Sequence, residues 1–464
     1  MSAGSPIRHR PGRQPHAWPF AVILTAVMAV TTPACAQTLR ETLAAAYLAN
    51  PDLAVGRARL DVVNEQRPQA LGGFLPSLSA AASRDVQDLT YDGVVNRTNR
   101  QDQQALTLNQ PVYSGGAASA GLDRAENTIR AEPARLRTTE SEVLLAAVTA
   151  HVDVARDLDV LNLNRQARDL LVRRLDQTRA LHDLGDATAA DLAQARARVA
   201  DAEARVVAAE AALAKSQATY LAVTGQEPTD PAPAPLPAHL PDTLGAALLR
   251  AREANPQIVA AGYDTEAATD GIAVSRGALL PKVSVTGSLS RNRSSLDVNP
   301  RETEAAAVGL QLTVPIYSAG IAESRLREAQ KTAAEARLSR IATERSIVER
   351  TERVWRDMLA ARAAIAAREA QVEAATTALD GVAREVDLGR RPLIDLLDAQ
   401  RDLLDASEAL AGARRDVVVA AFGVLAATGG LEARALALDV PYHDPTGDYE
   451  AVKWRVFVNP VTGE

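Results

Sequence analysis

Asp395 and Asp398 are the residues whose type and spacing best suit a chemical role. They follow a leucine–glycine pair and Arg391, at the start of a stretch with helical periodicity. Residues i and i+3 of a helix share one face, so both carboxylates point the same way. Several copies of this pair around one axis would attract cations. A single pair near a helix N-terminus would instead interact with the helix dipole and stabilise the helix by less than about 1 kcal/mol. The elements around the pair therefore decide what it does.

Other chemistries lack the residues that they need. The six histidines are scattered and Cys35 is the single cysteine, so a metal centre or a disulfide framework is not expected. His151 lies among alanine and valine, which favours a packed residue over a ligand. The chain has no nucleophile-elbow, zinc-protease or phosphate-loop motif. We therefore expect no enzyme activity and no cofactor.

The charge argues against a nucleic-acid partner. The chain has 51 basic and 58 acidic residues, a net charge of −7, and its first 36 residues hold three arginines and no acid. Without them, 48 basic residues face 58 acidic ones, a net charge of −10. No basic surface for nucleic acid is left.

The N-terminus has the pattern of a secretory signal peptide. Arg8, Arg10 and Arg13 precede an apolar run from Trp18 to Val30, and an Ala34-x-Ala36 cleavage signal follows. The run is shorter than the roughly 20 residues of a transmembrane helix. Cys35 allows a second interpretation, a lipoprotein signal, but Thr32 occupies the position where leucine is usual. We expect cleavage after Ala36 and export from the cytoplasm.

The rest of the chain is a tandem duplication. Five landmarks recur in order 204 or 205 residues later: Ala49-Asn50-Pro51 as Ala254-Asn255-Pro256, Leu75-Pro76 as Leu280-Pro281, Pro111-Val112-Tyr113-Ser114 as Pro315-Ile316-Tyr317-Ser318, Asp183-Leu184-Gly185 as Asp387-Leu388-Gly389, and Thr224-Gly225 as Thr428-Gly429. The predicted organisation is a signal peptide, a first repeat, a proline-rich linker that is semi-rigid, a second repeat and a C-terminal tail: residues 1–36, 37–227, 228–241, 242–431 and 432–464.

Each repeat has the same predicted order of elements. A helix interrupted at its Asn-Pro comes first, over 38–71 and 242–279. Two alternating segments follow, over 77–87 and 105–113 in the first repeat and 282–291 and 306–317 in the second. Polar loops, 88–104 and 292–304, join them. Helices over 117–184 and 321–388 come next, and each breaks at its Leu-Gly before a returning helix of about 35 residues.

The alternating segments are suited to a membrane. Val283, Val285 and Leu289 alternate with serine and threonine, and each segment is close to the 9–11 residues of a tilted transmembrane strand. No later segment has 18 uninterrupted apolar residues, so any membrane span must be made of strands. Four strands cannot close a barrel, and so two chains must contribute eight strands or three chains twelve. Twelve leave room for a conduit, which favours a trimer.

At this point the chain resembles the outer-membrane efflux protein family, the TolC-like channels. The resemblance rests on the duplicated Asn-Pro, Leu-Pro, Pro-Val/Ile-Tyr-Ser-x-Gly and Leu-Gly landmarks and covers essentially the whole mature chain. It implies a mainly α-helical protein with membrane β-strands, a homotrimer with a shared 12-stranded β-barrel in the outer membrane of a Gram-negative bacterium. Long coiled-coil helices would form an α-barrel across the periplasm, with an equatorial belt built partly from the chain ends.

The resemblance also implies roles for single residues. It places rings of aspartate, here Asp395 and Asp398, at the narrow periplasmic entrance, and a latch between helices that involves Asp191 and Arg391. The family's latch tyrosine and threonine are replaced by Val386 and Ala190, so the latch would rest on the Asp191–Arg391 pair.

Two tyrosines could mark the edge of the membrane. Tyr113 and Tyr317 end the predicted strands, where they would form an interfacial aromatic belt in contact with lipid, or else serve as plain packing residues.

The expected function is an export duct that docks with a periplasmic adaptor protein and an inner-membrane transporter of the ABC or RND type. The C-terminal Pro441-Tyr442-His443-Asp444-Pro445 resembles the ending of secretion-type members, which favours type I protein secretion over small-molecule or metal efflux. A structural periplasmic coiled-coil protein is the alternative of another class, and it would require the strand pairs to be surface hairpins.

Overall fold

The computed structural model describes residues 37–91, 95–295 and 301–455, without the side chains of residues 89–97. The predicted signal peptide with Cys35, and residues 456–464 of the predicted tail, lie outside the described residues.

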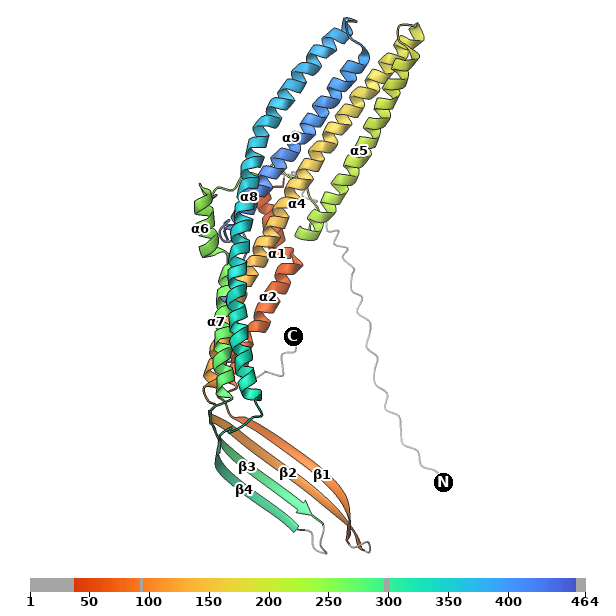
Figure 1. The fold of residues 1–464 in the computed structure, drawn as a ribbon. Coiled ribbons are helices and arrows are strands. Elements are labelled where there is room, and N and C mark those ends of the chain that lie inside the picture. Colours follow the sequence, from red (N-terminus) through yellow and green to blue (C-terminus); the bar gives the residue numbers. More distant parts are fainter. Residues whose placement is uncertain (1–36, 92–94, 296–300, 456–464) are drawn as a thin grey trace, which may run out of the picture. The chain divides into compact units, whose positions relative to one another are not determined.

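The described chain contains two copies of one order of elements (Figure 1). The first copy consists of α1 Leu39–Ala49, α2 Pro51–Asn64, α3 Gln66–Leu71, β1 Ser77–Tyr91, β2 Val95–Tyr113, α4 Ala117–Leu184 and α5 Ala189–Thr224. The second consists of α6 Leu244–Ala254, α7 Pro256–Gly277, β3 Lys282–Ser294, β4 Arg301–Thr313, α8 Ile321–Asp387 and α9 Leu393–Ala427, and α10 Pro445–Val452 follows it. The mainly helical fold with four strands and its tandem duplication are thus confirmed.

The strands differ from the prediction in length. The expected loops 88–104 and 292–304 are largely strand, because β1 and β2 pair from Ser77↔Asn109 to Tyr91↔Val95 and β3 and β4 pair out to Ser294↔Arg301. These parts of the strands contain mainly polar residues, so they lack the hydrophobic alternation that predicts a strand. The hydrogen bonds between strands join backbone groups and do not require hydrophobic side chains. The last strand ends at Thr313 and not at Tyr317, since Pro315 has no N–H to continue the ladder.

One asparagine in each repeat ties the first helices to the returning helix. The Asn50 side chain accepts from the backbone N–H of Asp52 at 2.9 Å and donates to the Val223 carbonyl at 3.0 Å. Asn255 makes the same two contacts, with the N–H of Gln257 at 2.9 Å and the Ala427 carbonyl at 3.0 Å. Each asparagine therefore caps the helix after it and satisfies a carbonyl at the end of α5 or α9.

A glycine follows each of these carbonyls. Gly429 has φ 73°, and a Cβ on it would lie 2.6 Å from the Ala254 carbonyl oxygen. The Thr-Gly landmark is therefore required both by the left-handed turn and by the close approach of the Asn-Pro segment.

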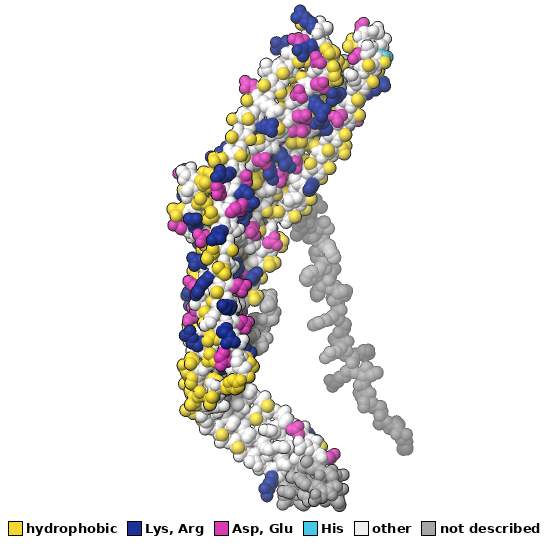
Figure 2. All heavy atoms as spheres, in the orientation of Figure 1, with side chains coloured by type: hydrophobic (Ala, Val, Ile, Leu, Met, Phe, Trp, Pro, Cys, Tyr) yellow, Lys and Arg dark blue, Asp and Glu magenta, His cyan; other side chains and the backbone are white. Residues whose placement is uncertain are grey.

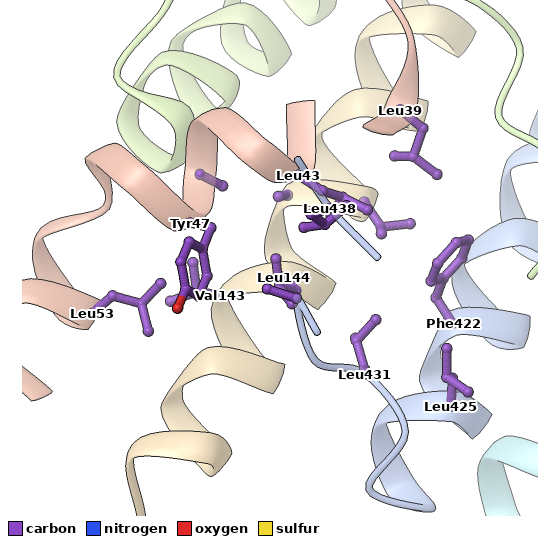
Figure 3. Packing of buried hydrophobic residues seen from close by; sticks show 14 of the residues in the cluster. Leu39, Leu43, Tyr47, Leu53, Val143, Leu144, Phe422, Leu425, Leu431 and Leu438 are labelled. Carbon is purple, nitrogen blue, oxygen red and sulfur yellow. The ribbon is translucent and has the colours of Figure 1, made fainter. Parts of the chain in front are cut away.

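The main hydrophobic core joins the chain ends to the long helices. Leu39, Leu43, Tyr47 and Leu53 of α1 and α2 face Leu144 of α4 (Figure 3). Phe422 and Leu425 of α9 complete the cluster, together with Leu431 and Leu438 from the segment after it (Figure 3). The segment 431–440 is thus held in place by packing, although it contains no helix or strand.

Among the described residues, no helix is both long enough and apolar enough to cross a membrane.

A buried hydrogen-bond chain holds the linker against the helices. His151 Nε2 lies 2.9 Å from the Ala232 carbonyl, and Nδ1 lies 2.8 Å from the Thr42 hydroxyl, which is 3.0 Å from the Tyr220 hydroxyl. Because a carbonyl can only accept, Nε2 carries the proton, and in the neutral ring Nδ1 accepts from Thr42. Burial lowers the pKa of His151, which favours this neutral form.

The lowered pKa of His151 predicts a stability that falls in acid. The unfolded chain takes up a proton on His151 at about pH 6.5, whereas the folded chain does so only at lower pH. Stability is therefore lost as the pH falls from about 6.5 through the folded pKa. Thermal unfolding followed by circular dichroism at about pH 7.5 and about pH 5.5 should show a larger loss for the wild type than for His151→Gln. The same substitution at the partly exposed His182 should leave the pH response of the wild type unchanged. A wild-type pH response in His151→Gln would contradict the assignment.

Candidate functional site

The four strands form one antiparallel sheet in the order β1-β2-β3-β4. Residues paired in register share a face, as Ala80, Leu106, Leu289 and Ala306 do. This face is apolar along most of its length: Leu78, Ala80, Leu106, Leu108, Val283, Val285, Leu289, Val308, Leu310 and Leu312. The opposite face is mainly small and polar: Ser77, Ser79, Ser83, Gln103, Thr107, Asn109, Thr286, Ser288, Ser290, Asn292, Thr303 and Gln311.

The apolar face has no cover within the described chain. Val308 is 86 % exposed, Leu310 72 % and Leu312 62 %. Figure 2 shows one face of the sheet, on which few hydrophobic side chains are visible, while charges of both signs cover the helices. An exposed patch of this kind on one side of a sheet indicates contact with lipid or with another chain.

Charged residues limit the apolar band toward the hairpin ends. Arg84, Asp102, Arg293 and Glu302 form one row across all four strands on the apolar face. Arg84 Nε lies 2.6 Å from Asp102 Oδ1, and Arg293 Nη2 lies 3.1 Å from Glu302 Oε2. Alternating charge lets each residue pair with its neighbour, and the row marks where the apolar surface ends.

A β-bulge turns Tyr113 to the apolar face. The register shifts between Pro111 and Tyr113, so that Tyr113 lies opposite Val283 and shares its face. Tyr317 follows the end of β4 and is 85 % exposed. The placement of Tyr113 suits an interfacial residue, and this role of both tyrosines stays a prediction.

The predicted gate lies where α8 turns into α9. Gly389 has φ 66° and allows the turn, and Asp395 belongs to the first turn of α9. Arg391 Nε lies 2.5 Å from Glu385 Oε2, and its Nη1 lies 3.6 Å from Asp395 Oδ2. The carboxylate of Asp395 thus has a local counter-ion, which it shares with Glu385.

The second residue of the predicted gate is paired with a distant helix. Arg198 Nη2, on α5, lies 2.5 Å from Asp398 Oδ1 on α9. One heptad further along both helices, Arg205 Nη1 lies 2.9 Å from Asp405 Oδ1. Neither pair was predicted from the sequence. The feature that could have indicated them is the spacing of seven residues between two arginines on one helix and between two aspartates on the other.

The structure places the two predicted latch residues in separate contacts. Asp191 and Thr188 form a capping box at the start of α5, in which the Thr188 hydroxyl donates to Asp191 Oδ2 at 2.6 Å. This hydrogen bond lowers the pKa of Asp191. Within the described part of one chain Arg391 pairs with Glu385 and Asp395 and not with Asp191. A latch between helices that joins Asp191 and Arg391 stays a prediction.

Across residues 37–91, 95–295 and 301–455, no group of three or more histidine, cysteine, aspartate or glutamate side chains is arranged to hold a metal ion.

Comparison with known proteins places this geometry in a family. The family model described as "Outer membrane efflux protein" matches residues 42–226 and 247–430. The chain is 30 % identical over 445 residues to the outer membrane efflux protein BepC of Brucella suis, covering 94 % of this chain and 95 % of that protein. It is 24 % identical over 419 residues to the outer membrane protein TolC of Escherichia coli, covering 86 % and 84 %.

A solved structure shares the fold. The CmeC outer membrane channel of Campylobacter jejuni matches with a TM-score of 0.77 at 16 % identity, over 91 % of this chain and 90 % of that one.

The two faces of the sheet predict opposite labelling of adjacent residues. Cys35 is the single cysteine and precedes the expected cleavage site, so Leu310→Cys and Gln311→Cys each supply one thiol in the mature chain. In native membranes, a hydrophilic maleimide should label Gln311→Cys, and a lipid-soluble maleimide should label Leu310→Cys. Equal labelling of both by the hydrophilic reagent would instead indicate hairpins on a water-exposed surface.

Proposed function

Because the chain belongs to the outer membrane efflux protein family, the TolC-like channels, we propose that three copies form one export duct. The protein is a non-enzymatic channel of the outer membrane of Gram-negative bacteria. The observation that carries the proposal is the four-stranded sheet with one apolar and one polar face. Closed into a barrel, such a sheet presents its leucines and valines to lipid and its serines and threonines to a water-filled interior.

The edges of the sheet support a trimer. One chain supplies four strands, and the outer edges of β1 and β4 carry backbone groups that lipid cannot satisfy. Two chains would give eight strands, whose interior side chains fill, whereas three give twelve strands and an open lumen. Pairing of β4 with β1 of the next copy would be antiparallel, like the three pairings within the sheet.

The helices would continue the duct through the periplasm. At 1.5 Å per residue, the 68 residues of α4 and the 67 of α8 each span about 100 Å, several times the thickness of a bilayer. Helices of that length from three copies would form a tube, whose far end docks with a periplasmic adaptor and an inner-membrane transporter of the ABC or RND type.

The mouth of this tube would lie at the turns after α4 and α8. Asp395 and Asp398 of three copies would make two stacked rings of carboxylates there, which attract cations. Arg391 is half exposed, and a contact with Asp191 would require it to leave Glu385. This contact would be the latch of the closed state.

For the cargo we favour proteins exported by type I secretion. The support is the resemblance of the sequence around Tyr442 and His443 to the ending of secretion-type members. In the fold, the Tyr442 hydroxyl donates to the Leu438 carbonyl, and the His443 N–H donates to the Tyr47 hydroxyl. Small-molecule or metal efflux is the second candidate, since the Brucella relative is named an efflux protein.

The trimer is tested by mass. Sedimentation in density-matched detergent should give about three times the mass of the mature chain, because an open lumen needs the twelve strands of three copies. A dominant monomer or dimer would contradict the shared barrel.

The cargo is tested by deletion of the gene. In a deletion strain, loss of one or more proteins from the culture medium with unchanged resistance to toxic organic compounds would support type I secretion. The reverse result would support small-molecule efflux. Complementation with the wild-type gene should restore whichever property is lost.

A further inference from the structure

The two helical hairpins are loosely packed near their tips. Hairpin α4–α5 and hairpin α8–α9 end on the same side in Figure 1. A cavity of about 360 Å³ lies between them, with an apolar lining that includes Leu163, Leu170, Leu171, Leu379, Leu397 and Leu404. Because of this cavity, the two hairpins make fewer van der Waals contacts with each other than closely packed helices do.

Ion pairs bridge the hairpins beside this cavity. Arg198 and Arg205 of α5 line it, and they hold Asp398 and Asp405 of α9 at 2.5 and 2.9 Å. The second pair lies seven residues, or about 10 Å, after the first along both helices, so α5 and α9 run parallel here. Asp398 remains 54 % exposed, which leaves it open to solvent ions as well as to Arg198.

The two gate carboxylates differ in the origin of their counter-ion. Asp395 is paired with Arg391, four residues away in the same turn. Asp398 is paired with a residue of the other repeat, 200 positions away in the sequence. The charge of Asp398 is thus compensated only while α5 lies against α9.

We propose that Arg198 determines the ion preference of the mouth by compensating the carboxylate of Asp398. This inference rests on the proposed function, in which Asp395 and Asp398 line the entrance. A guanidinium in contact with a carboxylate cancels most of its field at the distance of a passing ion. Arg198 therefore weakens the attraction of the mouth for cations. Separation of the hairpins frees one carboxylate in each copy, so that an opened mouth prefers cations more strongly than a closed one.

The test is the reversal potential of the purified channel in planar bilayers, with a KCl gradient in dilute salt. Arg198→Gln should raise the permeability ratio of K⁺ to Cl⁻ by roughly twofold or more, and it should increase block by a trivalent cation, because Asp398 is then uncompensated. Arg198→Gln combined with Asp398→Asn should return the ratio close to the wild-type value, since it removes both charges. Arg198→Lys keeps the charge and should behave as the wild type.

Arg205→Gln is the matched control. It breaks an ion pair between the same two helices about 10 Å farther from the tip, and Asp405 keeps a second arginine, Arg401, at 3.8 Å, so its effect on the ratio should be much smaller. Equal effects of Arg198→Gln and Arg205→Gln would show a general loosening of the helices and would overturn the proposal.

A second comparison separates this inference from the proposed function. Asp395→Ala with Asp398→Ala should lower cation selectivity and abolish block by multivalent cations. If this double variant does so while Arg198→Gln has no effect, the role of Arg198 is wrong and the mouth assignment stands. If neither has an effect, the mouth lies elsewhere and the proposal falls with it. Absence of conductance in the wild type would contradict the duct itself.

Discussion

The free outer edges of β1 and β4 are the constraint on which the rest of the structure depends. Within the described residues, each of these strands has a hydrogen-bonded neighbour on one side. Unpaired backbone groups in lipid cost several kcal/mol each, so a single sheet with an apolar face is unstable in a membrane and insoluble outside one. In the proposed duct, assembly with other copies would supply the missing neighbours of these edges. The same closure would also enclose the polar face and make a conduit.

The tandem duplication places the same asparagine contact in both repeats of the helical part. Asn50 and Asn255 each join the start of one helix to the end of another, and each contact needs a glycine beside it. Asn-Pro and Thr-Gly look in the sequence like independent stop signals for helices. In the structure they are two halves of a single contact, which explains why they recur together at nearly the same spacing. This contact fixes where α5 and α9 return, and hence where their other ends meet.

The elements that depend on local sequence were predictable, and those that depend on distant pairing were not. Both ends of α4, Ala117 and Leu184, agree with the prediction because glycine and the polar turn define them locally. The strands were underestimated because charged pairs such as Arg84 and Asp102 support the outer part of the hairpins, where hydrophobic alternation is lost. The predicted candidate site contained the carboxylates but not Arg198, since that contact requires the relative rotation of two helices from different repeats.

The electrostatics of the helix tips show what this difference means for function. Read from the sequence, Asp395 and Asp398 are a pair of equivalent acids. The fold makes them unequal, because the partner of Asp395 comes from its own turn and the partner of Asp398 from the other hairpin. A counter-ion within one turn moves with its acid and changes little when helices shift. A counter-ion on a neighbouring helix is lost as soon as the helices part, and a cavity beside the pair lowers the packing cost of that movement. In the proposed duct, the charge at the mouth would therefore depend on how the hairpins are arranged, and a change in that arrangement would alter the ions that the mouth attracts.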